Sequence, residues 1–267
     1  MALYCPRGFD VEGLRERIRA TYERVAEDPE GEFHFHRGGR YAGKYLNYSP
    51  EDIAAVPMIS VSRFAGVGNP HRIGALHAGE TVLDHACGAG MDLLLAARRV
   101  GPRGRAIGID MTRAMLDRAR RGAVAAGVDG WTSLFHGVFE ELPVDDASVD
   151  VVISNGVLNL APDKRRVFAE VFRVLKPGGR LHLADVVVQC ELPADALANI
   201  DLWTARIAGA LREQELFELA SATGFVRDRI TERFDCFCNT AAEHAVSRDV
   251  RIGAVNFFAR KPIVRMQ

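Results

Sequence analysis

The chain has 267 residues, and its 34 basic and 35 acidic side chains give a formal net charge of −1. This balance lacks the positive surface that nucleic acid or anionic lipid requires, so we expect no nucleic acid and no membrane among the partners. No apolar run reaches the roughly 18 residues of a membrane span, and the N-terminus lacks a signal-peptide pattern, which predicts a cytoplasmic protein. Composition leaves the oligomeric state open.

Residues 1–75 follow no regular alternation of strands and helices, and we interpret them as an N-terminal helical or lid extension to a domain at 76–267. Residues 12–27 and 51–57 have helical patterns. Between them, residues 33–48 interleave histidines and tyrosines with basic side chains. The His-x-His spacing there is compatible with a metal site, but a polar lid that packs aromatic rings on the domain is the preferred interpretation.

From residue 81 onward, short apolar runs alternate with helical patterns. Five strands are predicted at 81–86, 104–110, 131–137, 148–154 and 180–188. The helical patterns between them are typical of an α/β fold whose parallel sheet carries helices on both faces. Two helical segments then precede two further strands, at 194–209, 212–223, 225–234 and 252–261. Because little helix separates the last two strands, we expect an antiparallel pair at the sheet edge.

A glycine turn follows the first predicted strand. Between Asp84 and Gly90 the residues are mostly small, so backbone N–H groups at the start of the next helix can approach a ligand. The dinucleotide fingerprint is not met, since Leu93 stands where its last glycine belongs, which argues against a pyrophosphate.

An acid follows at the end of the second strand. Asp110 lies 22 residues after Gly88, where a carboxylate can accept hydrogen bonds from both hydroxyls of a ribose. The turn and the acid together indicate a nucleoside without a diphosphate. Alternatively, the glycines only pack a helix onto a strand, and Asp110 caps the helix that begins at Thr112.

Five motifs follow one another in the domain: VLDHACGAG, GIDMT, FEELP, DVVISNGVLNL and RVLKPGGRL. In this order they resemble a class I S-adenosylmethionine-dependent methyltransferase, and closely the arsenite methyltransferase family. The resemblance covers about residues 45–262. It implies a Rossmann-like, doubly wound, seven-stranded sheet with S-adenosylmethionine as cofactor, and a small-molecule methyl acceptor.

The resemblance also implies a set of cofactor-binding residues. Asp84 and the backbone of Cys87, Gly88 and Gly90 would hold the methionine part, and Asn155 would lie beside it. Asp110 would bind the ribose, Met111 would lie against the adenine, and Val138 and Phe139 would line the adenine pocket. The chain departs from the family pattern at His85-Ala86, which replaces a usual Leu-Gly, and at Val138, where a polar residue is often found.

Arsenite methyltransferases hold As(III) with cysteine thiolates, because a soft ion prefers soft ligands. The family pattern places these cysteines just before GNP, within ISN-x-V and just before IAGAL. This chain has Val67, Gly156 and Arg206 there. Its own cysteines, at 5, 87, 190, 236 and 238, form no regular framework and are better explained as core or surface thiols than as metal ligands.

Candidates for the acceptor side follow from the expected position of the methyl group. In open α/β sheets ligands lie at the reversal of strand order, so residues 154–158 are expected to face that group. The catalytic candidates are Asn155, at the end of the strand, and His71, Asp185 and Arg206, each of which could bind or deprotonate an acceptor. As alternatives, His71 caps a helix, Asp185 hydrogen-bonds a loop and Arg206 is solvated. The substrate-binding candidates are Gly156 and, from the lid, His36, Tyr41 and Tyr45, under which an aromatic acceptor could stack.

Three hypotheses for function remain open. The first is an S-adenosylmethionine-dependent methyltransferase acting on a small organic molecule, such as an aromatic compound or natural product, at carbon, nitrogen or oxygen. The second is an arsenite methyltransferase that uses Cys87, Cys190, Cys236 or Cys238. The third is a non-catalytic module that binds the cofactor as a sensor or assembly partner.

Overall fold

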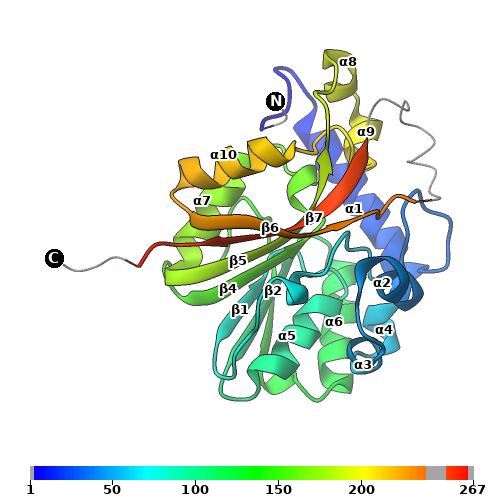
Figure 1. Cartoon of the computed structure of the whole chain (residues 1–267). Helices are drawn as coiled ribbons and strands as arrows, with labels where there is room; N and C mark the ends of the chain where they lie inside the picture. The colour runs from blue at the N-terminus through cyan, green and yellow to red at the C-terminus, as the bar shows by residue number, and fades with distance from the viewer. Residues whose placement is uncertain (1–2, 239–250, 264–267) are drawn as a thin grey trace.

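The computed structural model describes residues 3–238 and 251–263. Seven strands form one sheet in the order β3-β2-β1-β4-β5-β7-β6 (Figure 1). The first five are parallel to one another, and β7 runs antiparallel to both β5 and β6. Their bounds are β1 Thr81–Asp84, β2 Arg105–Asp110, β3 Thr132–His136, β4 Val149–Asn155, β5 Leu175–Val188, β6 Val226–Phe234 and β7 Ile252–Arg260. The predicted Rossmann-like sheet and its antiparallel C-terminal pair are confirmed.

Helices cover both faces of the sheet, as Figure 1 shows. On one face lie α5 (Met91–Val100) and α6 (Arg113–Ala125), and on the other lie α7 (Lys164–Val174) and α10 (Glu213–Thr223). The central strands β1 and β4 are apolar on both sides because each face meets a helix layer. The strand order reverses between β1 and β4, which fixes the edge of the sheet where ligands bind in such folds.

The N-terminal extension packs against the carboxyl end of this sheet. Its helices are α1 (Val11–Glu27), α2 (Gly38–Leu46), α3 (Pro50–Ala54), α4 (Met58–Val61) and the 3₁₀ turn η1 (Pro70–Arg72). Both α1 and α4 contact α6, and α1 also contacts α9 (Ile200–Thr204). The domain boundary expected between residues 75 and 76 stays a prediction.

Three predicted boundaries are corrected. The helix expected over 194–209 is two short helices, α8 (Ala194–Leu197) and α9, because the side chain of Asn199 caps α9 and restarts the helix. The segment 33–48, expected as a loop or lid, contains α2. Strand β5 begins at Leu175 rather than at 180, since Leu175 already pairs with Val149 before a register shift.

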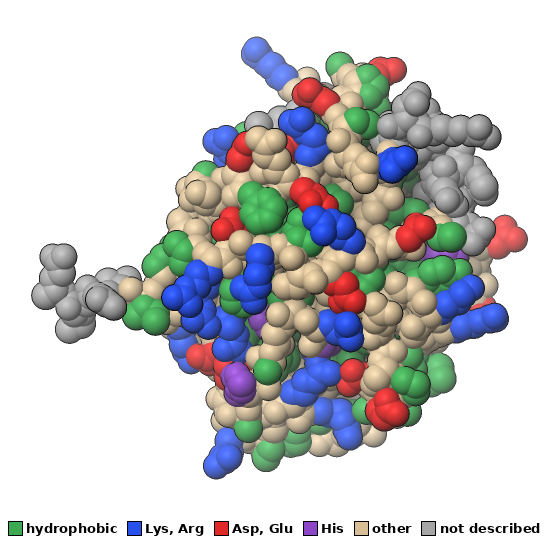
Figure 2. All heavy atoms as spheres, in the orientation of Figure 1, with side chains coloured by type: hydrophobic (Ala, Val, Ile, Leu, Met, Phe, Trp, Pro, Cys, Tyr) green, Lys and Arg blue, Asp and Glu red, His purple; other side chains and the backbone are tan. Residues whose placement is uncertain are grey.

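The surface agrees with the near-neutral composition. On the face drawn in Figure 2, basic and acidic side chains are interspersed. Within residues 3–238 and 251–263, no helix is both long enough and apolar enough to cross a membrane.

Candidate functional site

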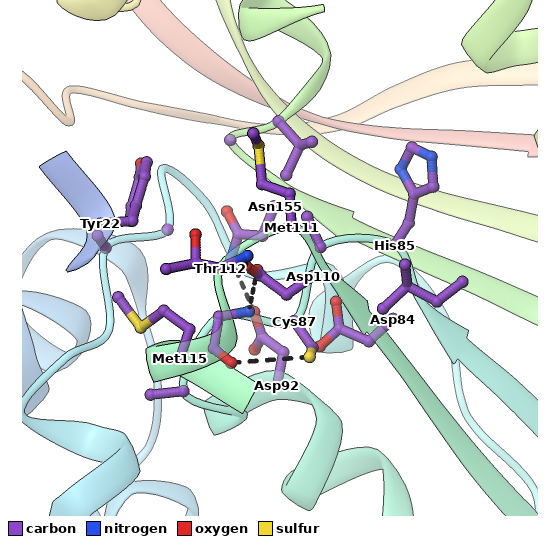
Figure 3. A pocket seen from close by; sticks show the side chains of 18 of the residues that line it. Tyr22, Asp84, His85, Cys87, Asp92, Asp110, Met111, Thr112, Met115 and Asn155 are labelled. Carbon is purple, nitrogen blue, oxygen red and sulfur yellow. Dashed lines mark hydrogen bonds between the residues drawn. The ribbon is translucent and has the colours of Figure 1, made fainter. Parts of the chain in front are cut away.

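A cavity lies at the carboxyl ends of β1, β2 and β4, beneath α1 (Figure 3). Its walls come from the glycine turn after β1, the end of β2, the bend after β4 and the N-terminal extension. Figure 3 shows Tyr22 of α1 on one side and Asp84 and His85 on the other. The cavity therefore joins the expected cofactor positions to the segment expected to face the acceptor.

Asp84 ends β1 with a carboxylate that is 3% exposed. Its Oδ2 atom is buried and has no hydrogen-bond partner among the described residues. Burial, together with the nearby charges of Asp92 and Asp110, raises the pKa of Asp84 well above its usual range. An unsatisfied buried acceptor on the cavity wall fits the α-ammonium group of S-adenosylmethionine, which would supply both donors and a neutralising charge.

The turn after Asp84 depends on two glycines with left-handed backbones, Gly88 at φ +52° and Gly90 at φ +90°. A Cβ at Gly90 would lie 3.1 Å from the Cβ of Ala119, so the missing side chain lets α5 start close to α6. Gly88 and Cys87 line the cavity, whereas Gly90 lies behind it as the N-cap of α5. Burial raises the pKa of the Cys87 thiol well above its usual value, so this sulfur is a packing group.

Asp110 both starts the next helix and faces the cavity. Its Oδ1 accepts from the N–H of Thr112 at 2.8 Å and its Oδ2 from the N–H of Gly88 at 2.9 Å. Burial raises the pKa of this carboxyl. Each carboxylate oxygen retains a second lone pair, so the capping contact leaves acceptors for a ribose.

Two of the three residues expected to contact the adenine line the cavity, and the third does not. Met111 and Phe139 line the cavity. Val138 pairs with Glu141 in an isolated bridge and borders a neighbouring surface hollow instead. Met111 also borders that hollow, so the two spaces adjoin at the end of β2.

His85, one of the departures from the family pattern, is accommodated by hydrogen bonds. Its Nδ1 lies 3.3 Å from Oγ of Ser154, and its Nε2 lies 3.3 Å from the carbonyl oxygen of Phe139. Burial lowers the pKa of His85 to about 4, so the ring is neutral near pH 7. The imidazole therefore ties the Phe139 segment to β4.

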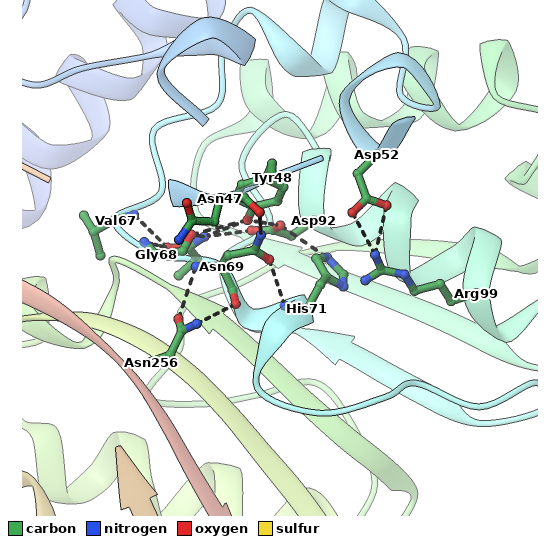
Figure 4. Close-up of polar contacts among 11 residues, drawn as sticks. Asn47, Tyr48, Asp52, Val67, Gly68, Asn69, His71, Asp92, Arg99 and Asn256 are labelled. Atoms are coloured by element: carbon green, nitrogen blue, oxygen red, sulfur yellow. Dashed lines mark hydrogen bonds and ion pairs between the residues drawn. The ribbon is translucent and has the colours of Figure 1, made fainter. Parts of the chain in front are cut away.

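Asn155, at the end of β4, uses its amide to hold the loop before η1. Figure 4 shows Val67 and Gly68 of this loop, with Tyr48 and Asp92 nearby. Its Oδ1 accepts from the N–H groups of Val67 (2.7 Å) and Gly68 (3.2 Å). Its Nδ2 donates to Gly68 O (2.9 Å), Asp92 Oδ2 (3.0 Å) and Tyr48 Oη (3.3 Å). Asn155 lines the cavity, but these bonds give it a positioning role rather than contact with a reacting atom.

Two further catalytic candidates do not reach the cavity. His71 lies in η1 with a side chain only 1% exposed, and its Nε2 is 3.3 Å from Oδ1 of Asp92, behind the cavity wall. Asp185 accepts hydrogen bonds from N–H groups at the bend after β4, as the alternative interpretation expected. Both residues therefore support the wall from outside.

The lid candidates pack on one another. The His36 ring stacks on Tyr45 with centroids 5.4 Å apart, and its Nε2 lies 2.8 Å from the carbonyl oxygen of Cys238. Tyr41 is buried and donates to the carbonyl of Gly66 at 3.1 Å. None of the three lines the cavity. Their predicted contact with an acceptor stays a prediction.

The three positions that would carry arsenic-binding cysteines converge at one end of the cavity. Gly156 has a left-handed backbone, with φ +73°. A Cβ added there would lie 2.5 Å from Nη1 of Arg206 and 3.2 Å from Cγ1 of Val67. The Arg206 guanidinium therefore occupies the space that a side chain at residue 156 would need.

Arg206 is 3% exposed and lines the cavity, so the solvated alternative is wrong. Its Nη2 donates to the hydroxyl of Tyr22, and its Cζ lies 5.3 Å from the centre of the Phe35 ring. In the part of the chain that the structure describes, no group of three or more His, Cys, Asp or Glu side chains is placed to hold a metal ion.

Tyr22, Phe64 and Asp92 are among the cavity residues that sequence reasoning missed. A signal existed for Tyr22, because Leu14, Ile18 and Tyr22 recur at helical spacing and so share the inner face of α1. Asp92 stands two residues after Gly90, in the first turn of α5, where an acid next to a glycine turn is a recognisable feature. Nothing local marked Phe64.

Comparisons with known proteins agree with this geometry. Residues 76–224 match a family described as a methyltransferase domain. The chain therefore belongs to that family, and it is a class I S-adenosylmethionine-dependent methyltransferase.

Similar proteins of known activity point to one branch of that class. The chain is 42% identical over 180 residues to an arsenite methyltransferase of Halobacterium salinarum, covering 67% of this chain and 46% of the relative. It is 36% identical over 161 residues to the human arsenite methyltransferase, covering 56% and 42%. A solved arsenic(III) S-adenosylmethionine methyltransferase from Chlamydomonas reinhardtii superposes with a TM-score of 0.73 at 34% identity, covering 82% of this chain and 76% of that one. The protein is thus close to the arsenite methyltransferases, although it spans less than half the length of these curated relatives.

Proposed function

We propose that this methyltransferase acts on a small organic acceptor rather than on arsenite. One observation carries the proposal: the positions of the three expected thiols hold Val67, Gly156 and Arg206, and these meet at one end of the cavity. An isopropyl group, a hydrogen and a guanidinium offer no soft ligand for As(III), whereas they can shape a pocket for an organic molecule.

S-adenosylmethionine supplies an electrophilic methyl group on a sulfonium, and the protein aligns an acceptor with it and excludes water. In our proposal Asp84 binds the α-ammonium and Asp110 the ribose hydroxyls. Asn155 fixes the 66–68 loop that closes the cavity. Gly156, with no side chain, leaves room for the Arg206 guanidinium at the acceptor end of the cavity.

Arsenite is the second candidate, because the named relatives methylate it. It would require thiolates from the cysteines that the chain has. Burial raises the pKa of the Cys236 thiol to about 12 and that of Cys87 well above its usual range, so neither is ionised near pH 7. This chemistry favours the organic acceptor.

A turnover assay separates the candidates. Formation of S-adenosylhomocysteine would be followed for the purified chain with arsenite plus a thiol reductant, and with a panel of small carboxylates, phosphates, phenols and amines. We expect turnover with at least one organic class and none above background with arsenite. Arsenite-dependent turnover that is lost when Cys87, Cys190, Cys236 and Cys238 are changed to serine would refute the proposal.

The same experiment bears on the non-catalytic alternative. Tight binding of S-adenosylhomocysteine without turnover of any acceptor would favour a sensor or assembly module. The cytoplasmic location expected from the sequence stays a proposal that cell fractionation can check. The absence of nucleic-acid and membrane partners, expected from charge, also stays a proposal, and filter-binding and vesicle-binding assays can check it.

A further inference from the structure

Arg206 has an unusual backbone for its residue type. It directly follows the C-cap residue of α9 at φ +67°, in the left-handed region that favours glycine. A side chain that is kept in this conformation and buried indicates a function for that side chain, because strain of this kind accumulates at ligand sites.

The guanidinium of Arg206 is only partly satisfied. Nη2 donates to the Tyr22 hydroxyl, Nη1 faces Gly156, and Nε is buried with no hydrogen-bond partner among the described residues. Since arginine carries five N–H donors, several remain for a ligand in the cavity.

The positive charge of Arg206 has no carboxylate in contact with it in residues 3–238 and 251–263. Asp185 is the carboxylate whose field reaches it. Both oxygens of Asp185, however, accept N–H groups of the bend after β4. Burial of a cation that has no carboxylate in contact with it is costly, and an anionic ligand would offset that cost.

The distribution of charge along the cavity points the same way. The carboxylates on its wall, Asp84, Asp92 and Asp110, come from the ends of β1 and β2 and the first turn of α5. Arg206 stands with Tyr22 and Gly156 on the wall formed by α1, the bend after β4 and the turn after α9. Arg63 also lines the cavity, but its guanidinium donates to the backbone carbonyls of Ala26 and Ile59. A cationic cofactor held by the acids would face a second cation, so an anion between them is electrostatically favoured.

We propose that Arg206 and Tyr22 form a subsite for an oxyanion, a carboxylate or a phosphate, carried by the methyl acceptor. The inference rests on the proposed function and names its substrate class. Guanidinium groups recognise both oxyanions through paired N–H donors, and the Tyr22 hydroxyl can donate a further bond. Phe64, on the same cavity, supplies an apolar surface for the rest of the acceptor.

Binding calorimetry tests the subsite without turnover. The full chain, saturated with S-adenosylhomocysteine, would be titrated with benzoate and phenyl phosphate, each against its neutral counterpart, benzamide and phenol. We expect one of the anions to bind about tenfold to a hundredfold more tightly than its counterpart, as one charged hydrogen-bonded pair implies. The anion that binds distinguishes carboxylate from phosphate.

Three variants test whether the preference for anions depends on Arg206 and Tyr22. Arg206→Gly suits the left-handed backbone, so it should fold, and it should abolish the preference for the anion while S-adenosylhomocysteine affinity stays unchanged. Tyr22→Phe should weaken the anion about threefold to tenfold by removing one hydrogen bond. Arg120→Ala, which removes an exposed arginine of α6, is the matched control and should bind anions like the unchanged chain.

Two results would overturn the subsite: anions that bind no better than their neutral counterparts, or an Arg206→Gly variant that keeps the preference. Failure of the proposed function looks different, because it would show as arsenite turnover or no turnover in the activity assay. The calorimetric preference for anions does not depend on that outcome.

Discussion

The two halves of the cavity are built in different ways. The cofactor half takes its polar groups from the ends of neighbouring strands and the turn between them, as with Asp84, Gly88 and Asp110. The acceptor half is assembled from α1, the 64–68 loop, the bend after β4 and the turn after α9. The first half is acidic and rigidly tied to the sheet, whereas the second presents a cation on connecting segments. Substrate choice can therefore change while the cofactor site stays fixed.

The largest effect is expected from removal of Asp110, the carboxylate proposed to bind the ribose in the cofactor half of the cavity. Asp110→Ala deletes the proposed bonds to two ribose hydroxyls, each worth about 1.5 to 3 kcal/mol as hydrogen bonds to a charged group, so affinity for S-adenosylhomocysteine should fall at least about a hundredfold. Calorimetry measures the loss. Asp117→Ala, an exposed acid of α6, is the control and should bind normally. Unchanged affinity in Asp110→Ala would show that the acid only caps α6.

The buried histidine beside the cofactor half gives a pH test. Burial lowers the pKa of His85 from 6.5 to about 4 in the folded chain. The stability that this depressed pKa contributes is present above pH 6.5 and is lost as the pH falls toward 4, a change of about 3 kcal/mol. Replacement by the leucine usual at this position, His85→Leu, should remove that dependence.

Urea unfolding of both proteins at several pH values between 7 and 4 checks this expectation. The difference in unfolding free energy between the original chain and His85→Leu should shift by about 3 kcal/mol toward the variant as the pH falls. A difference that is constant over this range would mean that the buried ring protonates as readily as in the unfolded chain.

A smaller effect is expected at Asp185, which supports the acceptor half of the cavity. The Asp185 carboxylate accepts five hydrogen bonds, four of them from residues 157–159. Asp185→Asn turns an amide NH₂ toward these donors, so the free energy of unfolding should fall by about 2 kcal/mol. Urea unfolding measures this change. If Asp185 were instead a general base, the variant would keep its stability and lose an ionisation from the pH profile of turnover.

Much of the fold could be predicted because its signals are local. Apolar runs marked the strands, and the glycine turn and Asp110 lay at spacings that a nucleoside site requires. One error was also local, since an asparagine cap divided the expected 194–209 helix. The other was not, because β5 is extended by pairing of Leu175 with Val149 on a neighbouring strand.

The acceptor end was less accessible to sequence reasoning, since its residues meet only through tertiary packing. Spacing identified Gly156 and Arg206 separately, but not that the guanidinium fills the space above the glycine. His71 and Asp185 were equally good catalytic candidates in the sequence. In the structure the His71 ring is buried against Asp92, and Asp185 accepts hydrogen bonds from the bend after β4, so neither faces the cavity.

The contact between Gly156 and Arg206 restricts the order in which this cavity could change by mutation. While the arginine is present, any side chain at residue 156 would place its first carbon 2.5 Å from a guanidinium nitrogen. The two positions are thus coupled: a cysteine at 156 requires the guanidinium to leave its present place, by a change of side-chain conformation or by loss of the arginine. Conversion between a sulfur-lined and a guanidinium-lined chamber therefore rearranges both residues together.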